Sequence, residues 1–186
     1  MEVHSYGDDD VKPQLLCNRP LPDALGQYAG AHHLWDAACF AVVSDLTLDG
    51  CYGEGALLFC RDRVIAYDAA ERAEPEAFQY KDLCNVKVRR MYGNVLFQTD
   101  IAGAQETLLR FTYAAAEVAE AAVRFVETVQ EGECHDTALE SVRASFERMR
   151  AFCPKCGRKL RAIDTPCLNC EGGGKAFKKF WVYIKP

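Results

Sequence analysis

The chain has 186 residues, of which 49% are hydrophobic and 26% are charged, and its formal net charge is −5. It can therefore bury one sizeable core and a small satellite domain. The longest wholly apolar run, residues 37–43, falls well short of the roughly twenty residues needed to cross a bilayer, and the N-terminus lacks the pattern of a signal peptide, so we expect a cytoplasmic protein.

Charge is distributed unevenly along the chain. From residue 151 onward there are eight basic and two acidic residues, a net charge of +6, which leaves −11 on the first 150 residues. An anionic partner would therefore meet the C-terminal end, although a solvated surface explains the same pattern. The candidate contacts for such a partner are Arg158, Lys159, Arg161, Lys175, Lys178 and Lys179.

Residues 1–33 form an N-terminal segment in the predicted organisation. Residues 1–19 carry an acidic run and scattered prolines, which is typical of a poorly ordered tail. Between Leu21 and His33 the apolar side chains recur at helical spacing, which predicts a short helix.

Residues 34–132 consist mainly of short runs of β-branched and aromatic residues separated by turn residues. This pattern predicts an antiparallel meander of about six or seven strands. The expected strands cover residues 35–48, 53–60, 64–67, 84–90, 95–99 and 107–111. Residues 61–63 are expected to form the turn of a hairpin.

A helix is expected to close this meander. Small and branched apolar residues recur on one face of Tyr113–Gln130, Thr112 can cap its start, and Gly132 can end it. A meander closed by one amphipathic helix is the layout of a pleckstrin-homology-like (PH-like) barrel, and Tyr80–Leu83 resembles bacterial domains of that type. We therefore expect an α+β chain whose residues 34–132 form an antiparallel PH-like β-barrel capped by a C-terminal helix.

Residues 133–151 are predicted to form a connecting helix. Thr137 and Glu140 make a capping-box pattern that would start it. The apolar residues that follow share one face: Leu139, Val142, Phe146 and Met149. Such a stripe predicts packing against the barrel or against a second chain.

Residues 152–186 carry the strongest motif, two Cys-x-x-Cys pairs separated by ten residues. Four thiolates at this spacing can surround one Zn²⁺ in the tetrahedral sulfur shell that this ion prefers. A shell of four cysteines leaves no position for water or substrate, so we expect structural zinc in a small zinc ribbon. The expected ligands are Cys153, Cys156, Cys167 and Cys170.

Motifs of common enzyme classes are absent from the sequence. It contains no P-loop, no dinucleotide-binding fingerprint and no nucleophile elbow. Its four histidines lie outside any motif that would pair them with a serine or cysteine nucleophile. We therefore predict that this chain is not an enzyme.

The C-terminal pattern resembles the cytosolic N-terminal extension of certain bacterial ABC transporters that fuse a permease to an ATP-binding domain. In that family a strand-rich domain precedes Cys-Pro-x-Cys-Gly-Arg-x-Leu, a second Cys-x-x-Cys and a basic stretch that enters the first membrane helix. The matching residues here are 153–160, the second cysteine pair and the aromatic end 181–186. The second pair departs from the family pattern because it lacks a proline.

The resemblance implies a regulatory or docking module of an ABC exporter, truncated before its first transmembrane helix and placed at the cytoplasmic face of the cell membrane. Its partners would be the transmembrane and ATP-binding domains of that transporter, or a second copy of the chain. The basic and aromatic residues of 178–186 are also typical of a membrane–water boundary.

Two other functions stay open. A free-standing zinc-ribbon protein would bind nucleic acid or a protein partner through its basic loop residues. A peripheral membrane protein would hold an anionic lipid headgroup in the barrel, with Lys87, Arg89 and Arg90 as candidate contacts.

Overall fold

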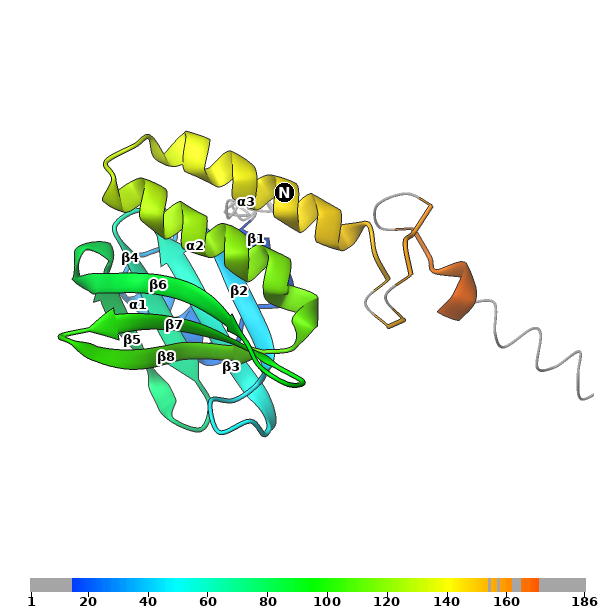
Figure 1. Cartoon of the computed structure of the whole chain (residues 1–186), viewed down its shortest axis with the longest axis horizontal. Helices are drawn as coiled ribbons and strands as arrows, with labels where there is room; N and C mark the ends of the chain where they lie inside the picture. Colours follow the sequence, from blue (N-terminus) through cyan, green and yellow to red (C-terminus); the bar gives the residue numbers. More distant parts are fainter. Residues whose placement is uncertain (1–14, 154, 157, 162–164, 171–186) are drawn as a thin grey trace, which may run out of the picture.

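The computed structural model describes residues 15–153, 155–156, 158–161 and 165–170, which form two β-sheets, covering helices and a small C-terminal module (Figure 1). The first sheet has the strand order β1–β2–β3–β4–β5. Its strands are β1 (Leu16–Cys17), β2 (Ala38–Leu46), β3 (Tyr52–Cys60), β4 (Arg63–Asp68) and β5 (Arg72–Gln79). The second sheet has the order β6–β7–β8, with β6 (Leu83–Arg90), β7 (Val95–Ile101) and β8 (Ala104–Phe111).

Antiparallel pairing of consecutive strands is confirmed within two separate runs, β2–β5 and β6–β8, and the strands do not close into the expected barrel. Within the described residues β5 pairs only with β4, and β6 pairs only with β7. The chain passes between the sheets through the short 3₁₀ helix η1 (Tyr80–Asp82). Side chains link the sheets instead: Ser44 Oγ donates to the carbonyl of Arg110 (2.6 Å), and Arg72 Nη1 donates to that of Thr107 (3.1 Å).

Two strands were missed by the sequence analysis. β1 lies within the segment expected to be poorly ordered, yet it pairs in parallel with the β2 residues Phe40 and Ala41. β5 contains Pro75 and two glutamates, a composition that argues against a central strand. This composition is tolerated because β5 is the last strand of its sheet among the described residues, and the proline needs no ladder hydrogen bond on that outer edge.

The first sheet is covered on both faces. Alternate side chains of β2, β3 and β4 point either into the space between the sheets or toward α1 (Asp23–Ala31), which confirms the predicted N-terminal helix. Leu25 and Ala29 of α1 are fully buried against this outer face. A strand buried on both faces needs apolar residues at successive positions, which explains the unbroken run Ala56–Cys60.

The closing helix starts later than predicted. A 3₁₀ turn, η2 (Tyr113–Ala115), precedes α2 (Ala116–Gln130), and the Thr112 side chain makes no capping hydrogen bond, so that predicted cap is wrong. The predicted end is confirmed, since Gly132 has φ of +80°, a left-handed conformation that suits glycine after a helix.

The capping box predicted for the next helix is also wrong. Helix α3 (His135–Arg150) begins two residues before Thr137. The first turn of α3 is instead held by a hydrogen bond to the first sheet: His135 Nε2 donates to the carbonyl of Arg61 (2.6 Å) in the turn between β3 and β4. The predicted apolar stripe is confirmed as a packing face: Leu139, Val142 and Phe146 are buried in the main core, and Met149 packs against it.

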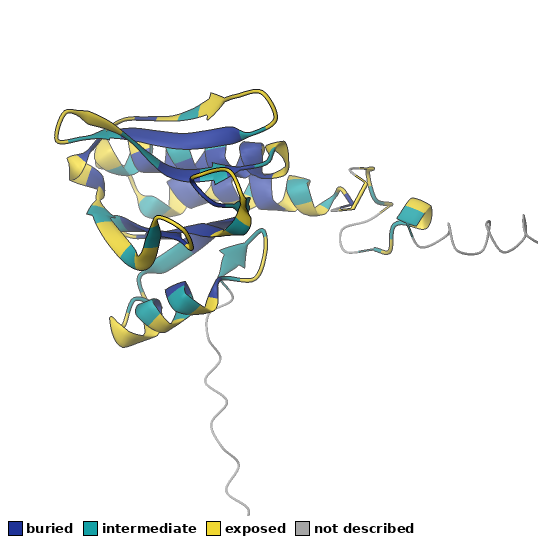
Figure 2. Cartoon of the chain, turned by 90° about the horizontal axis from the view of Figure 1, so that it is seen from below, coloured by how far each residue is buried: buried dark blue, intermediate teal, exposed yellow. Residues whose placement is uncertain are grey.

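The main core lies between the two sheets and the paired helices α2 and α3 (Figure 2). Phe125 of α2 is fully buried there, and its ring centroid lies 5.1 Å from that of Phe40 and 6.4 Å from that of Phe59. Tyr80 also contacts Phe125, and its hydroxyl donates to the carbonyl of Cys60 (2.6 Å). No helix in the described part of the chain is long and apolar enough to span a bilayer.

Replacing Phe125 with alanine should lower the free energy of unfolding by about 3–5 kcal/mol, because it empties the centre of this core. Urea denaturation followed by circular dichroism measures the change. Tyr92→Ala provides the control, since Tyr92 is fully exposed in the turn between β6 and β7, and it should change stability by less than about 0.5 kcal/mol. Equal effects of the two substitutions would contradict this assignment of the core.

Candidate metal centre

The first cysteine pair lies in a tight hairpin directly after α3. The Cys153 N–H donates to the carbonyl of Arg158, and the Leu160 N–H donates to that of Ala151, both at 2.8 Å. Phe152 and Lys159 form an isolated antiparallel bridge beside these bonds. The end of α3 therefore determines where the first two sulfur ligands are placed.

The second pair completes a cluster of four sulfur atoms. The Cys170 N–H donates to the carbonyl of Cys167 (3.0 Å), so the chain turns back on itself between these cysteines. The four Sγ atoms lie within 4.8 Å of one another, with 3.8 Å between Cys153 and Cys170 and 3.6 Å between Cys156 and Cys167. The predicted ligands are thus brought together in one site that can hold a metal ion.

The sulfur spacing is compatible with zinc. Zn–S bonds of about 2.3 Å in a tetrahedron place neighbouring sulfurs about 3.8 Å apart. The two Sγ–Sγ distances given above fall close to this value. Thiolates are also the ligands that favour zinc over the hard cations Mg²⁺ and Ca²⁺.

Two thiols of the cluster have pKa values shifted in opposite directions. A hydrogen bond from the backbone N–H of Arg158 lowers the pKa of Cys156 to about 6. Hydrogen bonding to Cys156 raises the pKa of Cys170 to about 12. The Cys156 thiolate is thus favoured while Cys170 keeps its proton, because the two sulfurs share a hydrogen bond. A divalent cation among the sulfurs takes the place of this proton and allows all four to ionise.

The module around the cluster has almost no hydrophobic core. Among the described residues from 152 to 170, only Cys153 is buried. Phe152 and Leu168 are 46% and 64% exposed, although both adjoin ligand cysteines. A segment of this size without a core depends on another source of stability, and a bound metal ion is the source that its residues offer.

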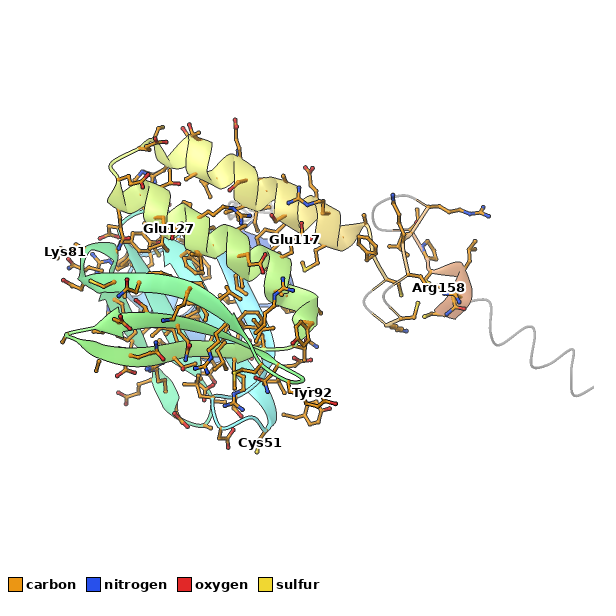
Figure 3. All side chains as sticks on the ribbon, viewed as in Figure 1. Cys51, Lys81, Tyr92, Glu117, Glu127 and Arg158 are labelled. Atoms are coloured by element: carbon orange, nitrogen blue, oxygen red, sulfur yellow. The ribbon has the colours of Figure 1, made fainter. Side chains whose placement is uncertain are left out.

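Some of the candidate anion contacts surround this cluster. Arg158, Lys159 and Arg161 are exposed in the module beyond the end of α3, where Figure 3 marks Arg158. Lys175, Lys178 and Lys179 lie outside the described residues, as do Pro154, Gly157 and the aromatic end 181–186. The exposed side chains of Phe152 and Leu168 were not identified from the sequence, although their positions beside cysteines were a usable signal.

The candidate lipid contacts lie at the end of β6, in the second sheet of the body and outside this module. Lys87 and Arg89 are exposed on β6. Arg90 forms an ion pair with Glu120 of α2, with 2.6 Å between Nη2 and Oε1. One of the three candidate cations is thus already paired with a carboxylate.

Comparison of the sequence with protein-family models and with curated proteins gives no match to this chain.

The purified chain should bind one zinc ion, and replacing a ligand should abolish tight binding because three sulfurs no longer complete the shell. Elemental analysis by mass spectrometry of the wild type, Cys156→Ser and Cys167→Ser measures the zinc content. Cys84→Ser is the matched control, as this exposed cysteine lies on β6, outside the cluster, and should leave the stoichiometry unchanged. Equal zinc content in all four proteins would refute this site.

Removing the metal should disorder the module and leave the body folded, since none of the described residues of the module belongs to either hydrophobic core. Two-dimensional NMR before and after addition of a strong chelator tests this. We expect the amide signals of residues 152–170 to collapse toward random-coil positions while those of β2–β8 persist. Collapse of the strand signals as well would show that the body also depends on the metal.

Proposed function

We propose that this chain is a non-catalytic docking module, in which a PH-like domain carries a structural zinc ribbon that contacts the partner. The cluster of four cysteines at the end of α3 carries this proposal. A metal ion held there would shape a segment that lacks a core, and would present Phe152 and Leu168 to a partner. Apolar side chains surrounded by cations are a common composition for an interface core and its rim.

Helix α3, which leads into the ribbon, is packed firmly against the body, and this supports a docking role. The apolar stripe of α3 packs on α2 and the main core, and Arg148 forms an ion pair with Glu117 of α2 near the C-terminal end of α3. A ribbon attached to such a helix keeps a defined position relative to the body. Binding of a partner at the ribbon would therefore be mechanically coupled to the body through α3.

The PH-like assignment rests on the order of the elements. Seven antiparallel strands divided between two sheets, followed by an amphipathic helix that covers the space between them, match the layout of that class. Among the described residues the two sheets are joined by side chains and by the helices that cover them, and no backbone pairing links one sheet to the other.

The parent protein that we propose is a bacterial ABC exporter, with this module on the cytoplasmic face of the membrane. This part of the proposal rests on the resemblance of residues 153–160, the second cysteine pair and residues 181–186 to the cytosolic extensions of such transporters. In that setting the module would dock on the transmembrane or ATP-binding domains, or on a second copy of itself.

A second candidate function is nucleic-acid binding by a free-standing zinc ribbon. The exposed cations Lys155, Arg158, Lys159 and Arg161 favour it, since they lie on one small module. The net charge of −11 on residues 1–150 argues against it, because it repels a polyanion. Binding to a DNA or RNA duplex at about 50 mM salt that weakens steeply at higher salt would favour this function over the transporter.

The coding sequence beyond the codon for Pro186 tests the transporter proposal. We expect an open frame with apolar segments of about twenty residues and a later P-loop. In the protein so defined, Cys167→Ser should reduce transport or assembly severalfold, whereas Cys84→Ser should not. A stop codon directly after Pro186, or transport that is indifferent to loss of the metal site, would refute it.

A further inference from the structure

A cavity of about 360 Å³ opens on the opposite end of α3 from the cysteine cluster. Three parts of the chain meet there: the start of the described chain at Leu15 and Leu16, the residues between α1 and β2, and the first turns of α3. The turn between β3 and β4 closes one side through Arg61, which the His135 ring holds in place by its bond to the Arg61 carbonyl. This volume lies in the lower part of the range of small-molecule sites.

The cavity has an apolar part and a charged part. Leu16, Trp35 and Leu139 supply apolar and aromatic surface, and Leu139 is buried. Two guanidinium groups, of Arg61 and Arg143, and two carboxylates, of Asp36 and Asp136, line the same space. The four charges sum to zero, so the cavity has no net preference for an anion or a cation.

These four charged residues are exposed, and none of them is held in an ion pair among the described residues. The half-buried thiol of Cys39 also lines the cavity. Its burial raises its pKa, and the nearby charges of Arg61 and Asp136 lower and raise that pKa, respectively. Charges of both signs therefore face a common space and keep their capacity for a bound group.

The lining favours a ligand that carries charges of both signs. A phosphate would meet two carboxylates as well as two guanidinium groups, and a simple amine would meet the same four groups, so the attraction and the repulsion offset each other for either ligand. A fully apolar ligand would offer the charged side chains no partner. A ligand with one carboxylate, one ammonium group and an apolar side chain matches each part: carboxylates pair well with arginine, and an ammonium group pairs with aspartate or lies over a tryptophan ring.

We propose that this cavity is a binding site for a small zwitterion, a free amino acid with an apolar side chain. Arg143 and Arg61 bind the carboxylate, Asp36 and Asp136 bind the ammonium group, and the side chain lies against Leu16, Leu139 and Trp35. The site is independent of the metal centre and adds ligand binding to the docking role. Because it joins the start of α3 to the first sheet, its occupancy would stabilise the helix that carries the cysteine cluster.

Isothermal titration calorimetry of the full zinc-loaded chain tests this site with L-leucine, L-methionine and L-phenylalanine. We expect saturable binding of at least one of them at ligand concentrations up to about 10 mM, a range in which a millimolar Kd can be measured. 4-Methylpentanoate lacks the ammonium group of leucine and isopentylamine lacks its carboxylate, so each should bind at least about tenfold more weakly than the best amino acid. No saturable binding, or equal binding of these analogues, would overturn the proposal.

Variants locate the site. Arg143→Gln and Asp136→Asn alter exposed residues of α3 and should each weaken binding about tenfold or more, with unchanged circular dichroism. Arg124→Gln is the matched control, because Arg124 is an exposed arginine of the neighbouring α2 that does not line the cavity. Binding that survives Arg143→Gln and Asp136→Asn undiminished would place the ligand elsewhere and overturn the assignment.

Discussion

The packing of α2 over the gap between the two sheets is the contact on which the rest of the body depends. The sheets share no backbone pairing in the described residues. The apolar face of α2, with Phe125 at its centre, therefore holds them together by hydrophobic packing. Gln130 strengthens the same junction, because its amide donates to the carbonyls of Tyr80 (2.6 Å) and Leu83 (2.7 Å) where the chain crosses between sheets. α3 then packs on α2 and places both the cavity and the cysteine cluster.

The two ends of α3 differ in what stabilises them. Its first turn is held by the His135 bond to Arg61 and by burial of Leu139, both within the body. Its last turn leads into a hairpin of exposed residues, whose order rests on backbone hydrogen bonds and on four sulfurs that favour a bound cation. The proposed zinc ion thus takes the place of a hydrophobic core in the module.

The elements that could be predicted from the sequence are those with a local signal. Alternating apolar residues revealed β6, and the stripe from Leu139 to Met149 revealed the buried face of α3. The two Cys-x-x-Cys pairs revealed the cysteine cluster, because metal coordination imposes a spacing that the sequence displays.

The features that were missed depend on distant parts of the chain. β1 forms by pairing with β2, and β5 tolerates Pro75 because it is the last strand of its sheet in the described part of the chain. The start of α3 depends on Arg61, which is 74 residues away from His135, so the Thr137 capping pattern gave the wrong boundary. The charged cavity was likewise invisible, since Asp36, Arg61 and Arg143 belong to three separate segments.

X-ray absorption at the zinc edge of the purified chain tests the central claim most directly. If the four cysteines hold a structural zinc ion, the spectrum shows four sulfur neighbours at about 2.3 Å and no nitrogen or oxygen in the first shell. Ligation by nitrogen or oxygen, or fewer than four sulfurs, would contradict the closed site and with it the account of the C-terminal module.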